Sequence, residues 1–175
     1  MKPRRFRHLF TAAVAAFVLA GCAGAPALLV QRERGNGDLS LVNEGERGSL
    51  GVLDTTARQR IGTIEGLGDL SHASVVYGRD GARAYVFGRD GALTKVNLRT
   101  GRIEGRVQQA GNSIGGAISQ DGTLVVAQNY TPGGIKVFNA DTLALVADIP
   151  AVVDGKPSRV VGLADLPGNR FIYSL

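Results

Sequence analysis

The chain has 175 residues, a formal net charge of +5 and 25 glycines, and 44% of its residues are hydrophobic. This apolar share excludes a disordered chain, and the absence of a strict three-residue glycine period excludes a collagen-like one. A single cysteine excludes a disulfide framework within the chain. The sequence pI of about 9.8 raises the question of nucleic-acid binding.

The N-terminal segment predicts a cleaved leader. Four basic residues stand within the first seven positions, and an apolar stretch follows from Leu9 to Ala20. That length is typical of a signal peptide and falls short of the roughly 20 apolar residues of a spanning helix. The sequence Leu19-Ala20-Gly21-Cys22 resembles a bacterial lipobox. We therefore expect a signal peptide over residues 1–21, lipidation at Cys22 and a lipidated tether over residues 22–36. The alternative is a plain secretory signal with an incidental cysteine.

The lipobox indicates a periplasmic protein that a lipid anchor holds at a membrane. Ala23 follows Cys22 where an aspartate would signal inner-membrane retention, which favours the outer membrane. Removing residues 1–21 takes away four positive charges and no negative one, which leaves 16 Lys and Arg against 15 Asp and Glu. The high pI therefore reflects the leader, and nucleic acid is not an expected partner.

From residue 37 onward, short β-rich runs alternate with turns rich in Gly, Asp and Asn. No stretch shows a helical apolar period over three turns. We predict thirteen strands: Leu39–Val42, Ser49–Asp54, Arg60–Ile64, Ala73–Tyr77, Ala84–Phe87, Leu93–Leu98, Ile103–Val107, Gly115–Ser119, Leu124–Gln128, Ile135–Phe138, Leu145–Ile149, Val160–Ala164 and Arg170–Ser174.

These runs repeat with a period of about 42 residues. Asp54, Asn97 and Asn139 occupy the same turn position after a glycine-led strand, 43 and 42 residues apart. Four short strands in such a period are typical of a β-propeller blade. The sequence therefore predicts an all-β fold, a partial β-propeller of about three to four four-stranded blades over residues 37–175. Because open blade faces are an aggregation hazard, we expect these blades to be the N-terminal part of a longer gene product.

His72 is the only histidine outside the leader, and it stands where a loop meets a strand. Ligands bind at such places in propellers, and a neutral imidazole can ligate a haem iron or transfer a proton near neutral pH. An ordinary polar rim residue, hydrogen-bonded to backbone, is the alternative, and position alone favours it.

Two arginines stand in twin Gly-Arg-Asp-Gly copies. Arg79 and Arg89 are ten residues apart and flank the run Ala84–Phe87. An arginine at the end of a blade strand can hold a carboxylate in a bidentate pair. The alternative is a solvated turn salt bridge with Asp80 or Asp90, worth roughly 0–1 kcal/mol. For Arg79 the sequence favours the salt bridge, and for Arg89 the two interpretations are equal.

The segment Gly111–Ala117 is glycine-rich but lacks the dinucleotide-binding spacing and the helix that should follow it. It either lets backbone approach a flat ligand or forms a tight loop between strands. Asn112 lies in this segment, and Tyr130 ends a later strand, where it presents its hydroxyl to a pocket or packs. No Ser/His/Asp set and no haem-attachment motif is present, so the residues specify no covalent reaction.

Several of these stretches, in order, resemble the haem d1 propeller family from about residue 37 to the C-terminus. They are Leu70-Ser71-His72, Ala84-Tyr85-Val86-Phe87-Gly88-Arg89-Asp90, Ala110-Gly111-Asn112-Ser113-Ile114-Gly115-Gly116 and Asn129-Tyr130-Thr131-Pro132-Gly133-Gly134. The resemblance is to the members that help to make haem d1 for the denitrification nitrite reductase. It implies an eight-bladed propeller, of roughly twice this length, that binds haem d1 or its dihydro precursor.

The resemblance also assigns roles to residues. It implies that His72 is a ligand of the haem iron, that Arg89 pairs with a carboxylate of the tetrapyrrole, and that Asn112, Tyr130 and Arg79 contribute less to the cofactor site. Other haem d1 maturation proteins and nitrite reductase are the implied partners. Whether such a protein is an enzyme or a carrier stays open. The alternative function is a cofactor-free propeller lipoprotein that serves as an interaction scaffold in the envelope.

Overall fold

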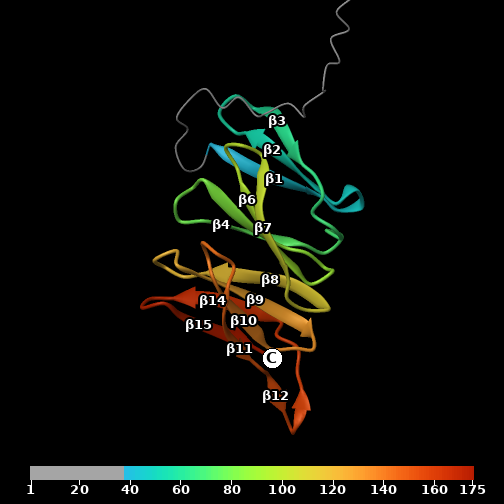
Figure 1. Cartoon of the computed structure of the whole chain (residues 1–175), viewed down its shortest axis with the longest axis vertical. Helices are drawn as coiled ribbons and strands as arrows, with labels where there is room; N and C mark the ends of the chain where they lie inside the picture. Colours follow the sequence, from blue (N-terminus) through green and yellow to red (C-terminus); the bar gives the residue numbers. More distant parts are fainter. Residues whose placement is uncertain (1–37) are drawn as a thin grey trace, which may run out of the picture.

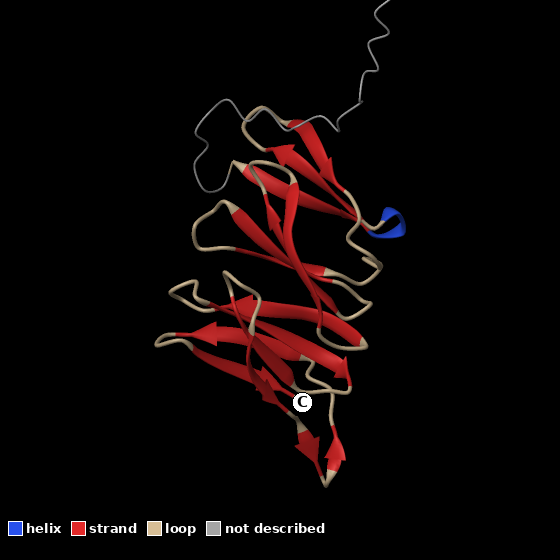
Figure 2. Ribbon diagram, in the orientation of Figure 1, coloured by secondary structure: helices blue, strands red, loops and turns tan. Residues whose placement is uncertain are grey.

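The computed structural model describes residues 38–175, so the predicted leader, lipidation site and tether lie outside the described residues. Fifteen strands and one short 3-10 helix fill this range, and Figure 2 shows how little of it is helical. Within residues 38–175, no helix is long and apolar enough to cross a membrane. The all-β prediction is confirmed.

The strands form a stack of small antiparallel sheets, the blades of a partial propeller (Figure 1). The first blade holds β1 (Leu39–Glu44), β2 (Ser49–Asp54) and β3 (Gln59–Ile64), with the helix η1 (Gly45–Arg47) between β1 and β2. The second holds β4 (Ser74–Tyr77), β5 (Arg83–Phe87), β6 (Ala92–Asn97) and β7 (Arg102–Gln108) in sequential order.

The third blade holds β8 (Asn112–Ile118), β9 (Leu124–Thr131), β10 (Ile135–Asn139) and β11 (Leu145–Ile149), again in sequential order. A fourth sheet follows with β14 (Gly162–Leu166) and β15 (Arg170–Ser174). Between the third blade and this fourth sheet, the chain forms a hairpin of β12 (Val152–Val153) and β13 (Lys156–Pro157), which the sequence did not predict. Each of its strands has two residues, too few for an alternating pattern to emerge.

The repeated turn residues close the turns in the way their spacing predicts. The Asp54 carboxylate accepts a hydrogen bond from the Ala57 backbone N–H at 2.8 Å. The Asn97 side chain accepts two, from the N–H groups of the second and third residues after it, and Asn139 does the same. These local side-chain acceptors fix the turn between the last two strands of each of the first three blades.

The core lies between the blades. Leu50, Val52 and Val86 belong to a cluster between the first two blades, and Phe87, Val125 and Phe138 belong to one between the second and third. Val126 and Val160 belong to a third cluster against the last sheet. Each blade therefore buries its faces only against its neighbours, as in a repeat protein.

Strands β4, β8 and β14 are the first strands of their sheets and adjoin one another, so they form the inner edge of the stack. We call the end at which β4 and β8 begin the His72 rim, because His72 lies just before β4. We call the opposite end, where β4 turns into β5, the Arg79 rim. Because successive strands of a blade are antiparallel, the turns that join them alternate between the two rims.

Candidate functional site

A local turn presents His72 to solvent at the start of the inner strand β4. The Asp69 carboxylate accepts hydrogen bonds from the Ser71 backbone N–H at 2.9 Å and from the Ser71 hydroxyl at 2.6 Å. These bonds, with a smaller contribution from the charge of Arg89, lower the pKa of the Asp69 carboxyl. The ionised turn holds the chain just before His72, whose side chain is exposed. An exposed imidazole here can ligate a metal through a ring nitrogen.

Arg89 lies at the same rim, in the turn between β5 and β6. Its backbone N–H donates to the Asp69 carbonyl oxygen at 2.9 Å, so this turn is joined to the His72 loop. The Arg89 side chain is exposed and makes no hydrogen bond or ion pair with any residue from 38 to 175. Neighbouring Asp90 pairs instead with Arg106, at 2.8 Å. Arg89 is therefore available to an anionic group, and it does not form the turn salt bridge with Asp90 that was the alternative.

Asn112 and Tyr130 lie at an irregular end of the β8–β9 pair, also at the His72 rim. Asn112 pairs with Thr131, while Ser113 pairs with Asn129, so Tyr130 is an extra residue in β9. Such a bulge re-aims a side chain, and bulges gather next to active sites. The buried Oδ1 atom of Asn112 has no hydrogen-bond partner among the described residues. A buried acceptor without a donor costs stability, and a ligand donor would satisfy it.

Behind Tyr130, a buried amide pair stiffens the rim. The Gln109 and Asn129 side chains exchange two hydrogen bonds of 2.9 Å, and Asn129 is fully buried. The Lys136 ammonium donates to the Gln109 carbonyl oxygen at 2.7 Å. Both polar groups of each amide are thus satisfied, which favours one arrangement of this part of the rim. This pair could not be predicted from the sequence, because its partners are 20 residues apart and follow no motif.

The structure separates Arg79 from the other four predicted site residues. Its guanidinium lies at the Arg79 rim, where it donates to the carbonyl oxygens of Ile118 and Ser119 at 3.1 Å each and pairs with Asp165 at 3.0 Å. It therefore links the second, third and fourth sheets. A groove of about 420 Å³ opens beside it between β4, β8 and β14. Arg79 is already engaged by the protein, so a structural role fits it better than ligand binding.

The glycine-rich segment is strand β8 rather than a loop. A Cβ atom at Gly116 would lie less than 3.0 Å from the Phe87 ring and from the Val126 carbonyl oxygen. At Gly115 it would lie 3.0 Å from the Ser74 hydroxyl. The glycines therefore allow the neighbouring strands, and not a ligand, to approach the β8 backbone closely. This packing brings β8 against β4 near His72.

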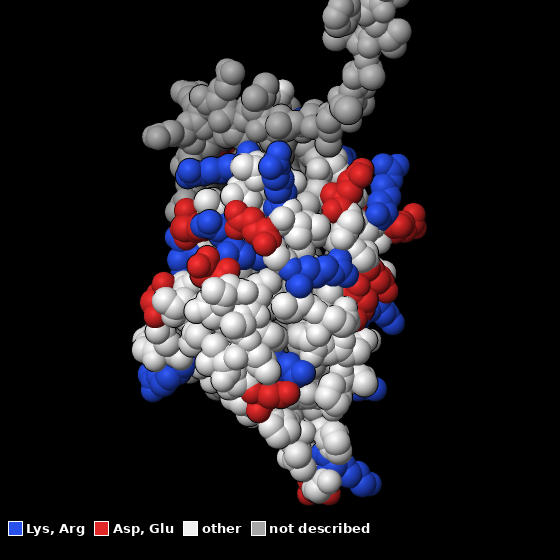
Figure 3. Space-filling view, in the orientation of Figure 1, with Lys and Arg blue, Asp and Glu red and all other residues white. Residues whose placement is uncertain are grey.

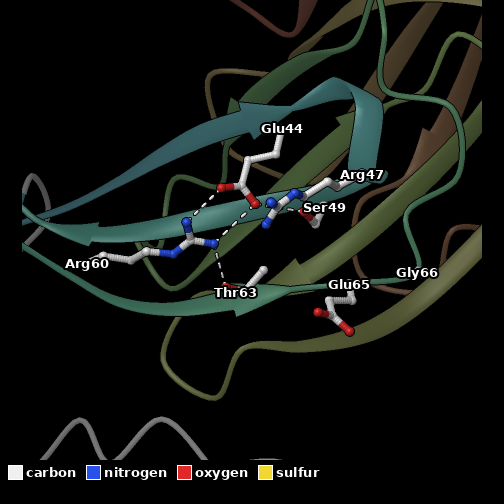
Figure 4. A pocket seen from close by; sticks show the side chains of 7 residues that line it. All are labelled: Glu44, Arg47, Ser49, Arg60, Thr63, Glu65 and Gly66. Atoms are coloured by element: carbon white, nitrogen blue, oxygen red, sulfur yellow. Dashed lines mark hydrogen bonds and ion pairs between the residues drawn. The ribbon is translucent and has the colours of Figure 1, made fainter.

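A separate polar pocket of about 380 Å³ lies on the first blade, lined by Glu44, Arg47, Ser49, Arg60, Thr63, Glu65 and Gly66 (Figure 4). The Arg60 guanidinium binds the Glu44 carboxylate with two bonds, of 2.7 and 3.1 Å. The Ser49 hydroxyl donates to the same carboxylate at 2.8 Å. The hydrogen bonds from Arg60 and Ser49 lower the pKa of Glu44, which keeps the pair charged. Because Arg60 is neutralised in this way, its guanidinium is not available to an anionic ligand.

The residues of the His72 rim fit a flat, anionic ligand with a central metal. His72 offers one ring nitrogen, Arg89 offers an unpaired cation, and Asn112 offers an unsatisfied acceptor. Among residues 38–175, no three His, Cys, Asp or Glu side chains gather as a metal site of their own. A metal at this rim would therefore depend on a ligand that brings most of its own donors, as a tetrapyrrole does.

The sequence matches the Cytochrome D1 heme domain family over residues 34–175. It is 59% identical over 145 residues to Protein NirF of Stutzerimonas stutzeri, which covers 81% of this chain and 37% of the relative. It is 56% identical over 161 residues to Protein NirF of Pseudomonas aeruginosa (strain PAO1), which covers 90% of this chain and 40% of the relative. The chain thus spans about two fifths of the length of these curated relatives.

Solved structures agree with the fold. Dihydro-heme d1 dehydrogenase NirN in complex with DHE superimposes with a TM-score of 0.74 and 27% identity, over 82% of this chain and 31% of that chain. Hydrazine synthase of Kuenenia stuttgartiensis, at 17% identity and a TM-score of 0.65, shares the fold over 78% of this chain and 41% of that chain. The partial propeller and the resemblance noted in the sequence are confirmed. The chain belongs to the cytochrome D1 heme domain family.

Proposed function

We propose that the chain forms the N-terminal blades of a periplasmic lipoprotein that binds haem d1 or its dihydro precursor during haem d1 biosynthesis. One observation carries this proposal: four residues implied by the family resemblance, His72, Arg89, Asn112 and Tyr130, come from two neighbouring blades and lie at the same rim. The match to NirF proteins and the fold of a dihydro-heme d1 dehydrogenase support it. The lipobox at Cys22 supports the membrane anchor and the periplasmic location.

In this proposal, each rim residue has a role set by its surroundings. His72 ligates the iron through a ring nitrogen, and the Asp69–Ser71 turn holds it in place. Arg89 binds a peripheral carboxylate, because no residue from 38 to 175 competes for its guanidinium. The Asn112 Oδ1 atom accepts a hydrogen bond from the ligand. The bound haem supplies a redox-active iron, while these residues bind and orient it.

An absorbance titration tests the proposal. The full chain is mixed with haem d1 and, separately, with its dihydro form, and the Soret region is recorded. We expect a saturable spectral change for the wild type, a different band position for His72→Ala, and an unchanged spectrum for Arg79→Ala. No change for the wild type, or the same spectrum for wild type and His72→Ala, contradicts the proposal.

A second candidate function is a cofactor-free interaction scaffold, and one observation favours it. The outer strand β11 and the following hairpin expose apolar side chains that a partner would cover: Leu145, Val146, Ile149, Val152 and Val153. In Figure 3, charged side chains crowd the upper half of the visible face, and few stand on the lower half. Under this proposal, substitutions in β11 would abolish partner capture while His72→Ala changes nothing.

A further inference from the structure

Arg159 is held at the His72 rim by its neighbours in the chain. It lies between β13 and β14, in a segment that matches none of the motifs found in the sequence. The Ser158 backbone N–H donates to the Ala151 carbonyl oxygen at 2.8 Å, and the Val160 N–H donates to the Asn129 carbonyl oxygen at 3.2 Å. Val160 is fully buried. The backbone that carries Arg159 is therefore anchored on both sides, although its side chain is exposed.

The Arg159 guanidinium is stacked and carries an uncompensated charge. Its central carbon lies 5.3 Å from the centroid of the Tyr130 ring, within the range of a cation–π contact. By contrast, Arg60, Arg79, Arg83 and Arg106 all form ion pairs. Arg159 forms no hydrogen bond or ion pair within the described part of the chain. Stacking restrains a guanidinium while its N–H donors stay available, which prepares it for a planar carboxylate.

The Tyr130 ring, over which this guanidinium lies, carries a second donor, its hydroxyl. It is the extra residue of the β9 bulge, and the buried Gln109–Asn129 amide pair fixes the strand just before it. Its hydroxyl makes no hydrogen bond with any residue from 38 to 175. A fixed phenol and a stacked guanidinium, both without protein partners, can together hold the two oxygens of one carboxylate.

We propose that Arg159 and Tyr130 form a second carboxylate-binding pair, distinct from Arg89, for a peripheral carboxylate of the tetrapyrrole. This proposal rests on the proposed function. Arg89 belongs to the second blade, whereas Tyr130 and Arg159 lie on and after the third, so the two cations grip different edges of a flat ligand. The pair thereby selects for a ligand with carboxylates on both edges.

The test compares two probes with carboxyl groups on both edges, free in one and esterified in the other: iron coproporphyrin III and its tetramethyl ester, each titrated into the full chain by absorbance. We expect Arg159→Ala to weaken binding of the free acid about tenfold, the effect of losing one charge-assisted hydrogen-bonded contact. Binding of the tetramethyl ester should be the same for Arg159→Ala and the wild type. Arg159→Lys keeps the positive charge but lacks the planar pair of N–H donors, so its affinity for the free acid should lie between those of the wild type and Arg159→Ala. Tyr130→Phe should weaken binding of the free acid and leave binding of the ester unchanged.

Arg99→Ala is the matched control, because Arg99 is exposed, makes no side-chain hydrogen bond or ion pair within residues 38–175, and lies at the opposite rim. It should leave the binding of both probes unchanged. Equal binding of the free acid by wild type and Arg159→Ala, or equal losses for acid and ester, overturns the carboxylate pair and leaves the proposed function standing. If the wild type binds neither probe, tetrapyrrole binding itself fails and the pair fails with it.

Discussion

Replacing Gly116 by alanine should destabilise the fold by wedging two blades apart. The new Cβ atom would lie less than 3.0 Å from the Phe87 ring and from the Val126 carbonyl oxygen. Ordinary van der Waals contacts begin near 3.4 Å. Phe87 is fully buried and Val126 belongs to the neighbouring strand, so neither can move without disturbing the core. Overpacking costs roughly 1–3 kcal/mol, and overlap with backbone places this site at the upper end, about 3 kcal/mol.

Urea unfolding followed by circular dichroism measures this loss. With an m-value of roughly 2 kcal/mol per molar, the midpoint should fall by about 1.5 M. Gly111→Ala is the matched control, because the nearest atom to its added Cβ would be the Thr131 carbonyl oxygen at 3.7 Å and its φ is not positive. That variant should gain about 0.4–1 kcal/mol through a less flexible unfolded chain. A Gly116→Ala midpoint at or above the wild-type value refutes the packing between the second and third blades described above.

Three further outcomes follow from named contacts. Arg79→Ala should lower the free energy of unfolding in urea by about 1 kcal/mol, since its ion pair with Asp165 is half exposed. Its porphyrin affinity should stay unchanged, and weaker porphyrin binding would place Arg79 in the site. Burial, and to a smaller extent the charge of Asp80, raises the pKa of Tyr85 to about 12. The hydrogen bond from the Tyr85 hydroxyl to the Ala140 carbonyl oxygen therefore contributes its full stability below pH 10, and this contribution is lost as the pH rises through 12. Alkaline titration at 295 nm should therefore lose its latest step in Tyr85→Phe, and an unaltered curve would contradict this. Asn112→Ala should not lower the urea midpoint, because its buried Oδ1 atom has no partner within the described chain and costs stability there, yet it should weaken porphyrin binding severalfold.

The repeated turns could be predicted because the interactions that make them are local. Asp54, Asn97 and Asn139 each bond to backbone within three residues, so their spacing alone identified the blade period. Strand limits were also predictable wherever apolar and polar residues alternate. The β12–β13 hairpin could not be predicted, because two-residue strands carry no period. The strand predicted over Gly115–Ser119 left out Asn112, because glycine-rich strands resemble turns.

The remaining features depend on contacts between blades, which sequence spacing does not encode. Arg79 and Arg89 stand in nearly identical sequences, yet one is engaged by Ile118, Ser119 and Asp165 while the other faces solvent. Antiparallel pairing of β4 with β5 sends these two arginines to opposite rims. The position of Arg159 could not be predicted either, because its contact with the Tyr130 ring depends on a bulge in β9 that no local sequence pattern indicates.

The rim residues come from successive blades, and this distribution makes the site depend on how the blades pack. His72 and Arg89 belong to the second blade, Asn112 and Tyr130 to the third, and Arg159 to the segment that leads to the fourth sheet. A chain of backbone bonds joins their loops: Arg89 to Asp69, the turn at Gly91 to the segment after β7, and that segment to the end of β9. Because each loop is bonded to the next, a shift of one blade moves every donor of the rim together. The packing of Gly116 against Phe87 therefore sets both the stability of the stack and the spacing at which the rim can hold a ligand.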